Sequence, residues 1–278
     1  MRTTLLDIGG TFIKCADGRQ IPIPSAGPRE GIAAALREAF KIPDQVGDDV
    51  MPGTDRGSWR IGIAIPGPFD YRRGIFRADH KFAAVEGESF RELAGLPEEA
   101  DVRFIHDVCA VLEGAIRGVR SDSTTALVTL GTGLGFAIAR RGMVRYGPSL
   151  SPADVIWNLP WEGGILEEKV SGRGLRALYS QLGGDPTLTA RDIAEQAFHG
   201  DRMAFEAYER MGATLGAAIK GLLHENQVDT LLFGGQISQS LDLMEDGLRE
   251  HLGYEIRIAR APERAVFKGI ETLFETNQ

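Results

Sequence analysis

The chain has 278 residues, of which 43% are hydrophobic and 25% are charged, and its formal net charge is -8. This length and composition are typical of a globular protein that buries its core without disulfide support. The negative charge disfavours nonspecific nucleic-acid binding, which depends on lysine and arginine neutralising phosphates. Cys15 and Cys109 provide neither a disulfide framework nor a thiolate metal cluster. We therefore expect a cytoplasmic protein with no nucleic-acid partner.

The sequence predicts neither a secretory signal nor a membrane span. Met1-Arg2 leads directly into a strand that carries Asp7, so no signal peptide is expected. No uncharged run approaches the ~18 apolar residues that a transmembrane helix needs. We expect no membrane partner.

The chain opens with a predicted strand, a tight glycine turn and a second strand. The apolar run Thr4-Leu5-Leu6 delivers Asp7 to Gly9-Gly10-Thr11, and an extended run follows from Phe12 to Ala16. Glycines let a ligand approach the backbone, and successive N–H groups form a concavity suited to phosphate oxygens. Asp7 repels phosphate, so its natural partner is a Mg²⁺ ion that bridges to the phosphate. The alternative is a plain β-hairpin with a solvated aspartate.

The following segments alternate between helical and strand-like patterns, which indicates an α/β fold. Residues 28–40 predict a helix because Ile32, Leu36 and Phe40 recur on one face, and 41–58 predict a loop. The remaining predicted elements are strands at 59–65, 102–106, 124–130, 134–140, 230–233 and 254–259, and helices at 107–119, about 165–226, about 237–252 and about 263–275.

A second glycine turn, Gly131-Thr132-Gly133, resembles the first. Its spacing is G-x-G-x-G and a strand follows it, whereas the dinucleotide-binding fingerprint is G-x-G-x-x-G and opens a helix. Backbone donors and the Thr132 hydroxyl suit a phosphate, and a structural turn is the alternative. Two similar halves with such turns would place a nucleotide in the cleft between them.

Three further positions follow predicted strands. Asp107 comes after strand 102–106 and before a helix, so it is either an N-cap or a carboxylate at the ligand-binding edge of the sheet. In the second case it can take a proton from a hydroxyl that attacks a γ-phosphate. His106 beside it suits a polyol or is a packed histidine. Gly234-Gly235 permits a flat ring or a ribose to approach, or forms an ordinary turn.

Five segments follow one another along the chain with these features. They are Asp7-Ile8-Gly9-Gly10-Thr11-Phe12-Ile13-Lys14, Gly62-Ile63-Ala64-Ile65-Pro66-Gly67-Pro68-Phe69-Asp70, His106-Asp107-Val108-Cys109-Ala110, Thr129-Leu130-Gly131-Thr132-Gly133-Leu134-Gly135 and Leu232-Phe233-Gly234-Gly235. In this order the segments resemble the ROK family (repressors, open reading frames and sugar kinases), nearly end to end. The resemblance implies a two-lobed actin-like ATPase fold of the ribonuclease H-like type with a central cleft. The lobes are expected at 1–106 plus 263–278 and at 107–262.

The resemblance also implies roles for individual residues. Asp107 matches the general base for a sugar hydroxyl, and Asp7 lies where Mg–ATP is approached. The residues expected to bind the nucleotide are Asp7, Gly9, Gly10, Thr11, Lys14, Gly131, Thr132, Gly133, Gly234 and Gly235. Those expected on the sugar side are Gly67, His106, Asp154, Trp157 and Glu167.

The sequence departs from the family on the sugar side. His106 stands where the family usually has asparagine, and Asp154 and Trp157 replace its usual glutamate and histidine. Trp157 offers a stacking face for a sugar, or belongs to the core. Ile165 stands where a cysteine is expected and the cysteine-rich loop is missing, so we expect no structural zinc. Glu167 matches a sugar-contacting glutamate, and a solvated acid is its alternative.

We therefore expect an ATP- and Mg²⁺-dependent kinase that phosphorylates a hydroxyl of a hexose or amino sugar. The resemblance implies a homodimer. One alternative is a non-catalytic sugar- or nucleotide-binding protein, because the sugar-side motifs are altered. The other is a sugar-responsive transcriptional regulator, which is disfavoured because the first strand begins by Thr3 and leaves no room for an N-terminal helix-turn-helix extension.

Overall fold

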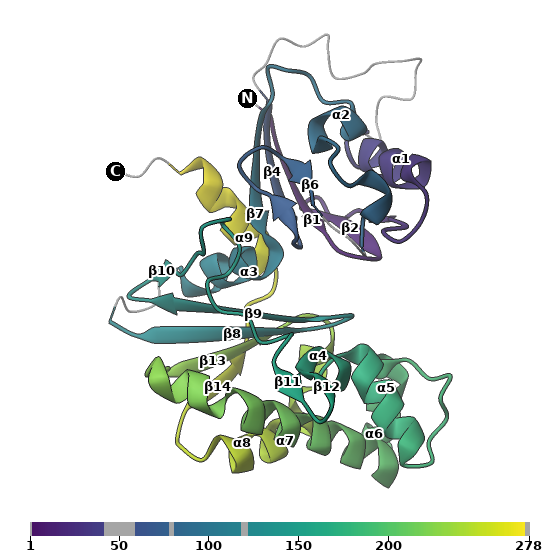
Figure 1. Ribbon diagram of the computed structural model, residues 1–278, viewed down its shortest axis with the longest axis vertical. Coiled ribbons are helices and arrows are strands. Elements are labelled where there is room, and N and C mark those ends of the chain that lie inside the picture. Colours follow the sequence, from purple (N-terminus) through teal and green to yellow (C-terminus); the bar gives the residue numbers. More distant parts are fainter. Residues whose placement is uncertain (1, 42–58, 78–80, 118–121, 276–278) are drawn as a thin grey trace. The chain divides into compact units, whose positions relative to one another are not determined.

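The computed structural model describes residues 2–41, 59–77, 81–117 and 122–275 (Figure 1). The chain divides into two compact units, and helix α3 and residues 146–151 belong mainly to the first. Unit 1 comprises Met1–Ala115, Tyr146–Ser151 and Arg264–Gln278, and unit 2 comprises Ile116–Arg145 and Pro152–Glu263. Most of the loop expected at 41–58 lies outside the described residues.

Unit 1 is built on a five-stranded mixed sheet. The strand order is β3 (Gln20–Pro22), β2 (Phe12–Cys15), β1 (Arg2–Ile8), β4 (Trp59–Ile65) and β7 (Asp101–His106). The three strands β1, β2 and β3 pair antiparallel, whereas β4 and β7 continue the sheet in parallel with β1. This parallel arrangement brings the carboxyl ends of β1, β4 and β7 to one edge of the sheet.

Helices pack on the sheet of unit 1. The helix α1 (Arg29–Ala39) contacts β2 and β3 and buries Ile32 and Leu36, as the sequence pattern predicts. A small second pair of strands, with the short helices that follow it, adds an aromatic cluster that includes Phe76, Phe82 and Phe90. These elements are β5 (Phe69–Asp70), β6 (Ile75–Phe76), η1 (Ala83–Val85) and α2 (Phe90–Ala94).

Two glycines let α3 (Asp107–Ile116) pack closely against α9 (Ala265–Glu271), which itself packs on β1 and β4. A side-chain carbon on Gly114, near the end of α3, would overlap the backbone of α9, and one on Gly269 would overlap the backbone of α3 at Ala110. The two helices therefore meet at backbone contact, which only glycine permits.

Unit 2 repeats the sheet plan of unit 1. Its strand order is β10 (Met143–Val144), β9 (Leu134–Arg140), β8 (Thr124–Leu130), β13 (Thr230–Gly234) and β14 (Arg257–Arg260). The hairpin of β8 and β9 is antiparallel, and β13 and β14 continue in parallel with β8. In both sheets a hairpin with a glycine turn stands beside parallel strands, which supports the similarity seen between the two turns in the sequence.

Helices cover the sheet of unit 2 and bury its larger apolar side chains (Figure 1). The longest is α7, which begins after the N-cap Asp201 and packs closely on α8. The remaining elements of unit 2 are β11 (Pro160–Trp161), β12 (Gly164–Ile165), α4 (Leu166–Lys169), α5 (Gly172–Gln181), α6 (Ala190–Phe198), α7 (Arg202–Glu225), η2 (Ile237–Leu243) and α8 (Glu245–Leu252).

Some predicted element boundaries near the C-terminus are wrong. The single helix expected over 237–252 is divided at Met244 into η2, a 3-10 helix that is itself kinked at Ser240, and α8. The strand expected at 254–259 is β14, which begins only at Arg257. The last helix is shorter than expected: it comprises α9 and one turn of 3-10 helix, η3 (Thr272–Phe274). The strands predicted at about 124–130 and 134–140 are confirmed as β8 and β9.

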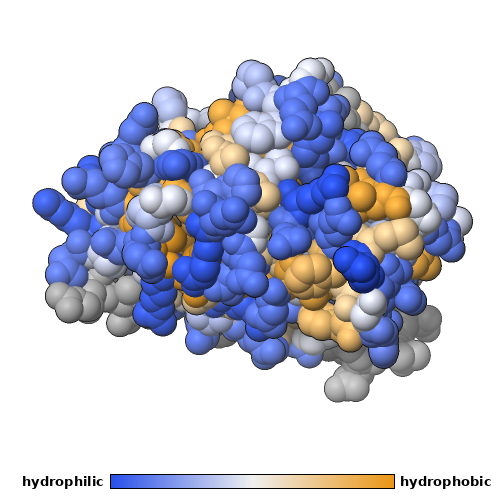
Figure 2. All heavy atoms as spheres, turned by 90° about the horizontal axis from the view of Figure 1, so that it is seen from below, coloured by the Kyte–Doolittle hydropathy of each residue, from blue (hydrophilic) through white to orange (hydrophobic). Residues whose placement is uncertain are grey.

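Figure 2 shows one face of the molecule, on which hydrophilic residues predominate and hydrophobic residues form small separate groups. A few large hydrophobic side chains are exposed, among them Met143 and Phe198. None of the described helices is long and apolar enough to cross a membrane.

Candidate functional site

The glycine turn of unit 1 is held by hydrogen bonds from three directions. The Gly9 N–H donates to the Phe12 carbonyl at 2.9 Å, which closes the turn between β1 and β2. The Ile23 N–H donates to the Thr11 carbonyl at 2.9 Å, and Ser25 Oγ donates to the Gly10 carbonyl at 2.5 Å. The turn is therefore fixed by its own neighbours, while Thr11 is exposed.

Asp7 lies near the end of β1, directly opposite Lys14 of β2, and the two side chains form an ion pair at 3.6 Å. The Asp7 side chain is only 18% exposed. Burial raises the pKa of Asp7 to about 6; Lys14 opposes this increase and the negative charge of Asp107 adds to it. Lys14 alone therefore does not offset the cost of burying the ionised Asp7 carboxylate, and the carboxylate suits a divalent cation as a further partner. Magnesium is often held by one or two carboxylates together with substrate phosphates.

Asp107 follows the end of β7 and is the first residue of α3. Its Oδ1 accepts a hydrogen bond from the Val108 N–H at 2.7 Å and lies 2.8 Å from His106 Nδ1. Burial by itself raises the pKa of Asp107. The charge and hydrogen bond of His106, the Val108 N–H and the charge of Lys81 outweigh this and hold the pKa below its usual range.

The Asp107 side chain remains 40% exposed. An ionised carboxylate that solvent and ligands can reach is suited to accept a proton from a bound hydroxyl. Asp107 is the first residue of α3 and not the N-cap that precedes the helix, and its Oδ1 accepts the N–H of the next residue, Val108. This contact at the start of the helix is compatible with proton transfer to the same carboxylate.

His106 and Gly67, both expected on the sugar side, lie beside each other. A Cβ added to Gly67 would lie 3.6 Å from His106 Nε2 and 3.4 Å from the Tyr71 hydroxyl. The Tyr71 hydroxyl donates to the Ile65 carbonyl at 3.1 Å, and the rings of Tyr71 and His106 are 5.8 Å apart. Burial raises the pKa of Tyr71, so its hydroxyl keeps its proton at neutral pH.

Three residues of this region were not found from the sequence, namely Ser25, Tyr71 and Lys81. Each lies on a different loop or turn, and none is part of a motif whose spacing predicts a ligand contact. The structure places Lys81 against Gly10 and Tyr71 against His106. In the sequence, Lys81 is only a basic residue followed by the aromatic Phe82, and this pattern is too common to predict a functional residue.

The glycine turn of unit 2 is bound by its neighbours in a different way. The Gly131 N–H donates to the Gly133 carbonyl at 3.1 Å, and the Gly172 N–H donates to the Gly131 carbonyl at 2.8 Å. Thr132 is exposed, and a Cβ added to Gly131 would meet no atom within 4 Å. One side of the turn is therefore open to a ligand.

The structure brings Gly234-Gly235 next to this turn. Gly234 is the register partner of Thr129, one residue before the end of β8. Gly235 has a φ of +83°, and any Cβ there would clash with the Leu130 backbone. Glycine is required at this position both for the left-handed conformation and for the close approach.

The start of α5 packs against this turn, a contact that was not predicted from the sequence. Ser171 caps the helix by accepting the Gly174 N–H at 3.3 Å, and Gly172 packs on the Gly131 carbonyl. The sequence signal was an ordinary serine N-cap, which is found at many helices without ligands.

The residues of unit 2 that were expected on the sugar side are engaged with other parts of the protein. Glu167 Oε2 accepts the Leu134 N–H at 2.9 Å, and the Glu167 N–H donates to the Trp157 carbonyl at 3.0 Å. Asp154 forms an ion pair with Arg145 at 3.3 Å. The Trp157 side chain is 44% exposed, so the alternative that it belongs to the core is wrong.

Within the described ranges, no group of three or more histidine, cysteine, aspartate or glutamate side chains is arranged to hold a metal ion. Both cysteines, Cys15 and Cys109, are free and buried. A cation at Asp7 would therefore need further ligands, such as phosphate oxygens and water, to complete its coordination.

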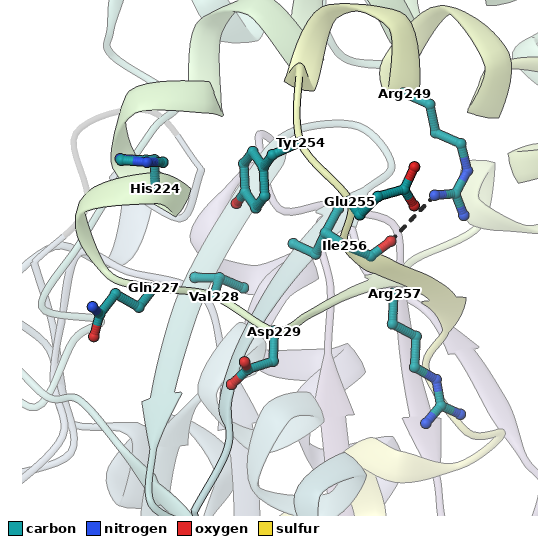
Figure 3. A pocket seen from close by; sticks show the side chains of 9 residues that line it. All are labelled: His224, Gln227, Val228, Asp229, Arg249, Tyr254, Glu255, Ile256 and Arg257. Carbon is teal, nitrogen blue, oxygen red and sulfur yellow. Dashed lines mark hydrogen bonds between the residues drawn. The ribbon is translucent and has the colours of Figure 1, made fainter.

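A hollow of about 750 Å³ in unit 2 lies away from these residues (Figure 3). It is lined by residues before β13 and at the start of β14, such as Asp229 and Arg257, whereas Gly234 ends β13. The hollow is therefore at the opposite edge of the sheet from the Gly131–Gly133 turn. None of the predicted site residues lines it.

Comparisons with known proteins agree with this architecture. The ROK family model matches residues 6–268, nearly the whole chain. The glucokinase of Thermotoga maritima is 25% identical over 214 residues, which is 68% of each protein. The crystal structure of a ROK family glucokinase from Streptomyces griseus, in complex with glucose and AMPPNP, has a TM-score of 0.75 at 22% identity and covers 98% of each chain.

A ROK family transcriptional regulator, described as a homolog of the E. coli MLC protein, has a TM-score of 0.69 at 18% identity. This match covers 97% of the present chain and 77% of the regulator. The structural matches confirm the expected actin-like ATPase fold, with two mixed α/β sheets. Because the family model matches nearly the full length of the chain, the chain belongs to the ROK family.

Proposed function

We propose that this protein is an ATP-dependent sugar kinase that transfers the γ-phosphate to a hydroxyl group of a hexose or amino sugar. The observation that carries the proposal is the arrangement in unit 1. Asp107 is an ionised and accessible carboxylate, and its charge acts on Asp7, which directly precedes the glycine turn. Phosphoryl transfer needs positioning, charge neutralisation and one base, and these residues provide the last two.

Asp107 is the general base in this proposal. It takes the proton from the acceptor hydroxyl as the oxygen attacks the γ-phosphorus, and ADP leaves. Its lowered pKa keeps it ionised at neutral pH, so the carboxylate is ready without a prior proton transfer. His106 and Gly67, which lie beside each other, are proposed to contact the sugar.

Asp7 is proposed to hold the magnesium ion that accompanies ATP. When bound, the ion neutralises negative charge on the phosphates. Lys14 keeps Asp7 ionised in part and orients it across the hairpin. The backbone N–H groups of the turns Gly9–Thr11 and Gly131–Gly133 are proposed to bind phosphate oxygens, and Gly234-Gly235 to border the nucleoside.

The similarity to glucokinases supports a sugar acceptor, and the residues that depart from the family motif support an acceptor that is not bound in the usual way of the family. Asp154 pairs with Arg145 and Glu167 holds the Leu134 N–H, so two expected sugar ligands already have partners in the protein. Trp157 offers an exposed ring on which the C–H face of a sugar can stack.

The experiment that tests the proposal is a phosphate-transfer assay with ATP and Mg²⁺ over a panel of hexoses, amino sugars and their acylated forms. We expect one acceptor class to be phosphorylated by the wild type and not by Asp107→Asn. An Asp107→Asn variant with full activity would remove Asp107 from the mechanism. Absence of transfer to every sugar in the panel would contradict the kinase function.

A non-catalytic sugar- or nucleotide-binding protein is the second candidate. The internal partners of Asp154 and Glu167 favour it, because side chains that already bind Arg145 and the Leu134 N–H are less available to a sugar. Calorimetry distinguishes the two. Binding of a sugar or of ATP without any turnover favours the second candidate, whereas turnover excludes it.

A further inference from the structure

Lys81 lies over the glycine turn of unit 1. A Cβ added to Gly10 would be 3.3 Å from Lys81 Cε and 3.5 Å from its Cδ. The aliphatic stem of the lysine therefore covers the face that Gly10 leaves open, in the manner of long basic side chains on apolar surface. Since Nζ is bonded to Cε, the ammonium group is held close to this turn.

The backbone that carries Lys81 is fixed by buried neighbours. The Phe82 N–H donates to the Ser25 carbonyl at 2.6 Å, and Ser25 Oγ in turn donates to the Gly10 carbonyl. The Phe82 side chain is buried and packs on Phe76 with ring centroids 5.4 Å apart. Lys81 is thus tied through Ser25 to the turn that it covers.

Phe82 also has a φ of +63°. This conformation is uncommon for a residue other than glycine and persists only where the surrounding structure imposes it. Backbone strain of this kind is concentrated at functional sites, and here it lies next to Lys81. The placement of Lys81 is therefore determined by contacts that its own side chain does not make.

The two lysines near the turn differ in their partners. Lys14 forms an ion pair with Asp7 across the hairpin. Lys81 has no such ion pair with any carboxylate that the structure describes. Its charge is, however, one of the influences that lower the pKa of Asp107. Lys81 therefore brings positive charge to both the glycine turn and Asp107.

We propose that Lys81 is a further catalytic residue whose ammonium group binds the phosphoryl group as it passes from ATP, at the Gly9–Thr11 turn, to the acceptor beside Asp107. The proposal deepens the kinase function and rests on it. In the transfer, the acceptor oxygen bonds to the γ-phosphorus, the bond to the β,γ-bridging oxygen breaks, and the acceptor proton goes to Asp107. Lys81 keeps its protons and contacts the non-bridging oxygens.

This role follows from where charge develops in the reaction. Negative charge is spread over the equatorial oxygens of the transferred phosphoryl group, and fixed cations at that point stabilise the transition state. Two carboxylates, Asp7 and Asp107, otherwise border this path and repel the phosphoryl group. Lys81 offsets that repulsion.

The test uses Lys81→Met and Lys81→Arg in the full chain, with the exposed surface lysine variant Lys41→Met as the control. The Lys41 side chain is 72% exposed and pairs with Glu38. Calorimetry measures the Kd of AMPPNP and of ADP, each with Mg²⁺. AMPPNP carries the γ-phosphoryl group and ADP does not, so only AMPPNP binding reports on the proposed contact.

We expect Lys81→Met to weaken AMPPNP binding by about tenfold, the usual effect of one lost charge-assisted hydrogen bond, with ADP binding unchanged. Lys81→Arg, which keeps the charge, retains most of the affinity, and Lys41→Met behaves as wild type. Equal losses for AMPPNP and ADP, or no loss for either, would overturn the role of Lys81.

This readout separates Lys81 from the kinase proposal. If no sugar is phosphorylated but Lys81→Met weakens AMPPNP alone, the phosphoryl contact holds and the transfer to a sugar fails. If sugars are phosphorylated and Lys81→Met has the kcat, KM and AMPPNP affinity of the wild type, the kinase function holds and the inference about Lys81 fails. A Lys81→Met chain with an unchanged unfolding midpoint shows that lost affinity is not lost folding.

Discussion

The two glycine turns share a backbone plan and differ in their chemistry. Each closes an antiparallel hairpin at the edge where parallel strands end. The turn of unit 1 is surrounded by charged side chains, Asp7, Lys14 and Lys81, and Asp107 acts on it electrostatically. The turn of unit 2 is bordered by backbone groups of Gly172 and Gly235 and by one carboxylate, that of Glu167, which accepts the Leu134 N–H.

This difference indicates that the two turns have different roles. Charged side chains that respond to one another supply proton transfer and charge neutralisation, whereas exposed backbone groups supply binding without acid–base chemistry. Variants in unit 1 should therefore change kcat, and variants in unit 2 should change affinity or stability. The predictions below test that contrast.

The largest expected effect is on kcat. Asp107→Asn should lower kcat by roughly 10³-fold, within the range for loss of a general base. Thr132→Ala in the unit 2 turn should leave kcat close to wild type and raise the KM for ATP a few-fold, roughly the effect of one lost hydrogen bond. Steady-state kinetics on the identified acceptor measures both. A larger kcat loss in Thr132→Ala than in Asp107→Asn would reverse the assignment of the two turns.

The second effect concerns Asp7 and pH. Because its pKa is raised in the folded protein from 3.8 to about 6, folding favours the protonated form. Below pH 3.8 Asp7 is protonated in both states and does not lower the free energy of unfolding. As the pH rises to about 6, the wild type loses up to roughly 3 kcal/mol of that free energy. Asp7→Asn, which cannot ionise, should be more stable than wild type above that range and nearly equal below it.

Urea unfolding at pH 3.5 and pH 8 measures this difference. The same variant should be inactive at pH 8, since the amide lacks the charge proposed to hold magnesium. A destabilised Asp7→Asn at pH 8 would mean that the Lys14 ion pair outweighs burial, contrary to the direction of the pKa shift.

A smaller effect is expected at Gly235. Gly235→Ala places a Cβ against the Leu130 backbone, in addition to the strain of a positive φ. Gly142→Ala is the matched control, because its φ is +73° and no atom lies within 4 Å of the added carbon. We expect about 1 kcal/mol of destabilisation for the control and roughly 2 kcal/mol more for Gly235→Ala. Equal unfolding free energies would show that β8 moves freely away from the turn.

The smallest effect is expected at Glu167. Glu167→Ala removes the acceptor for the Leu134 N–H and should destabilise the chain by about 1 kcal/mol, with a modest rise in the KM for ATP. Chemical denaturation and kinetics check this. If the KM for the sugar rises instead, with stability unchanged, Glu167 contacts the acceptor as the family resemblance implies.

Much of the fold was predictable because the signals are local. The strands at 124–130 and 134–140 are dense in apolar residues and bounded by glycine, so their limits follow from the sequence itself. The single helix expected over 237–252 is wrong because the chain forms a kinked 3-10 helix first and begins α8 only after Met244, and hydrophobic periodicity does not register such local breaks.

The sequence by itself determined the glycine turns, the position of Asp107 between strand and helix, and the family. Each depends on residues adjacent in the chain. The packing of the fold was needed to show that Lys81 lies over Gly10, that Glu167 holds the Leu134 N–H and that Gly235 touches Leu130. These contacts join segments from 33 to 105 residues apart. Their geometry is set by how helices and strands pack, and local residue patterns do not encode it.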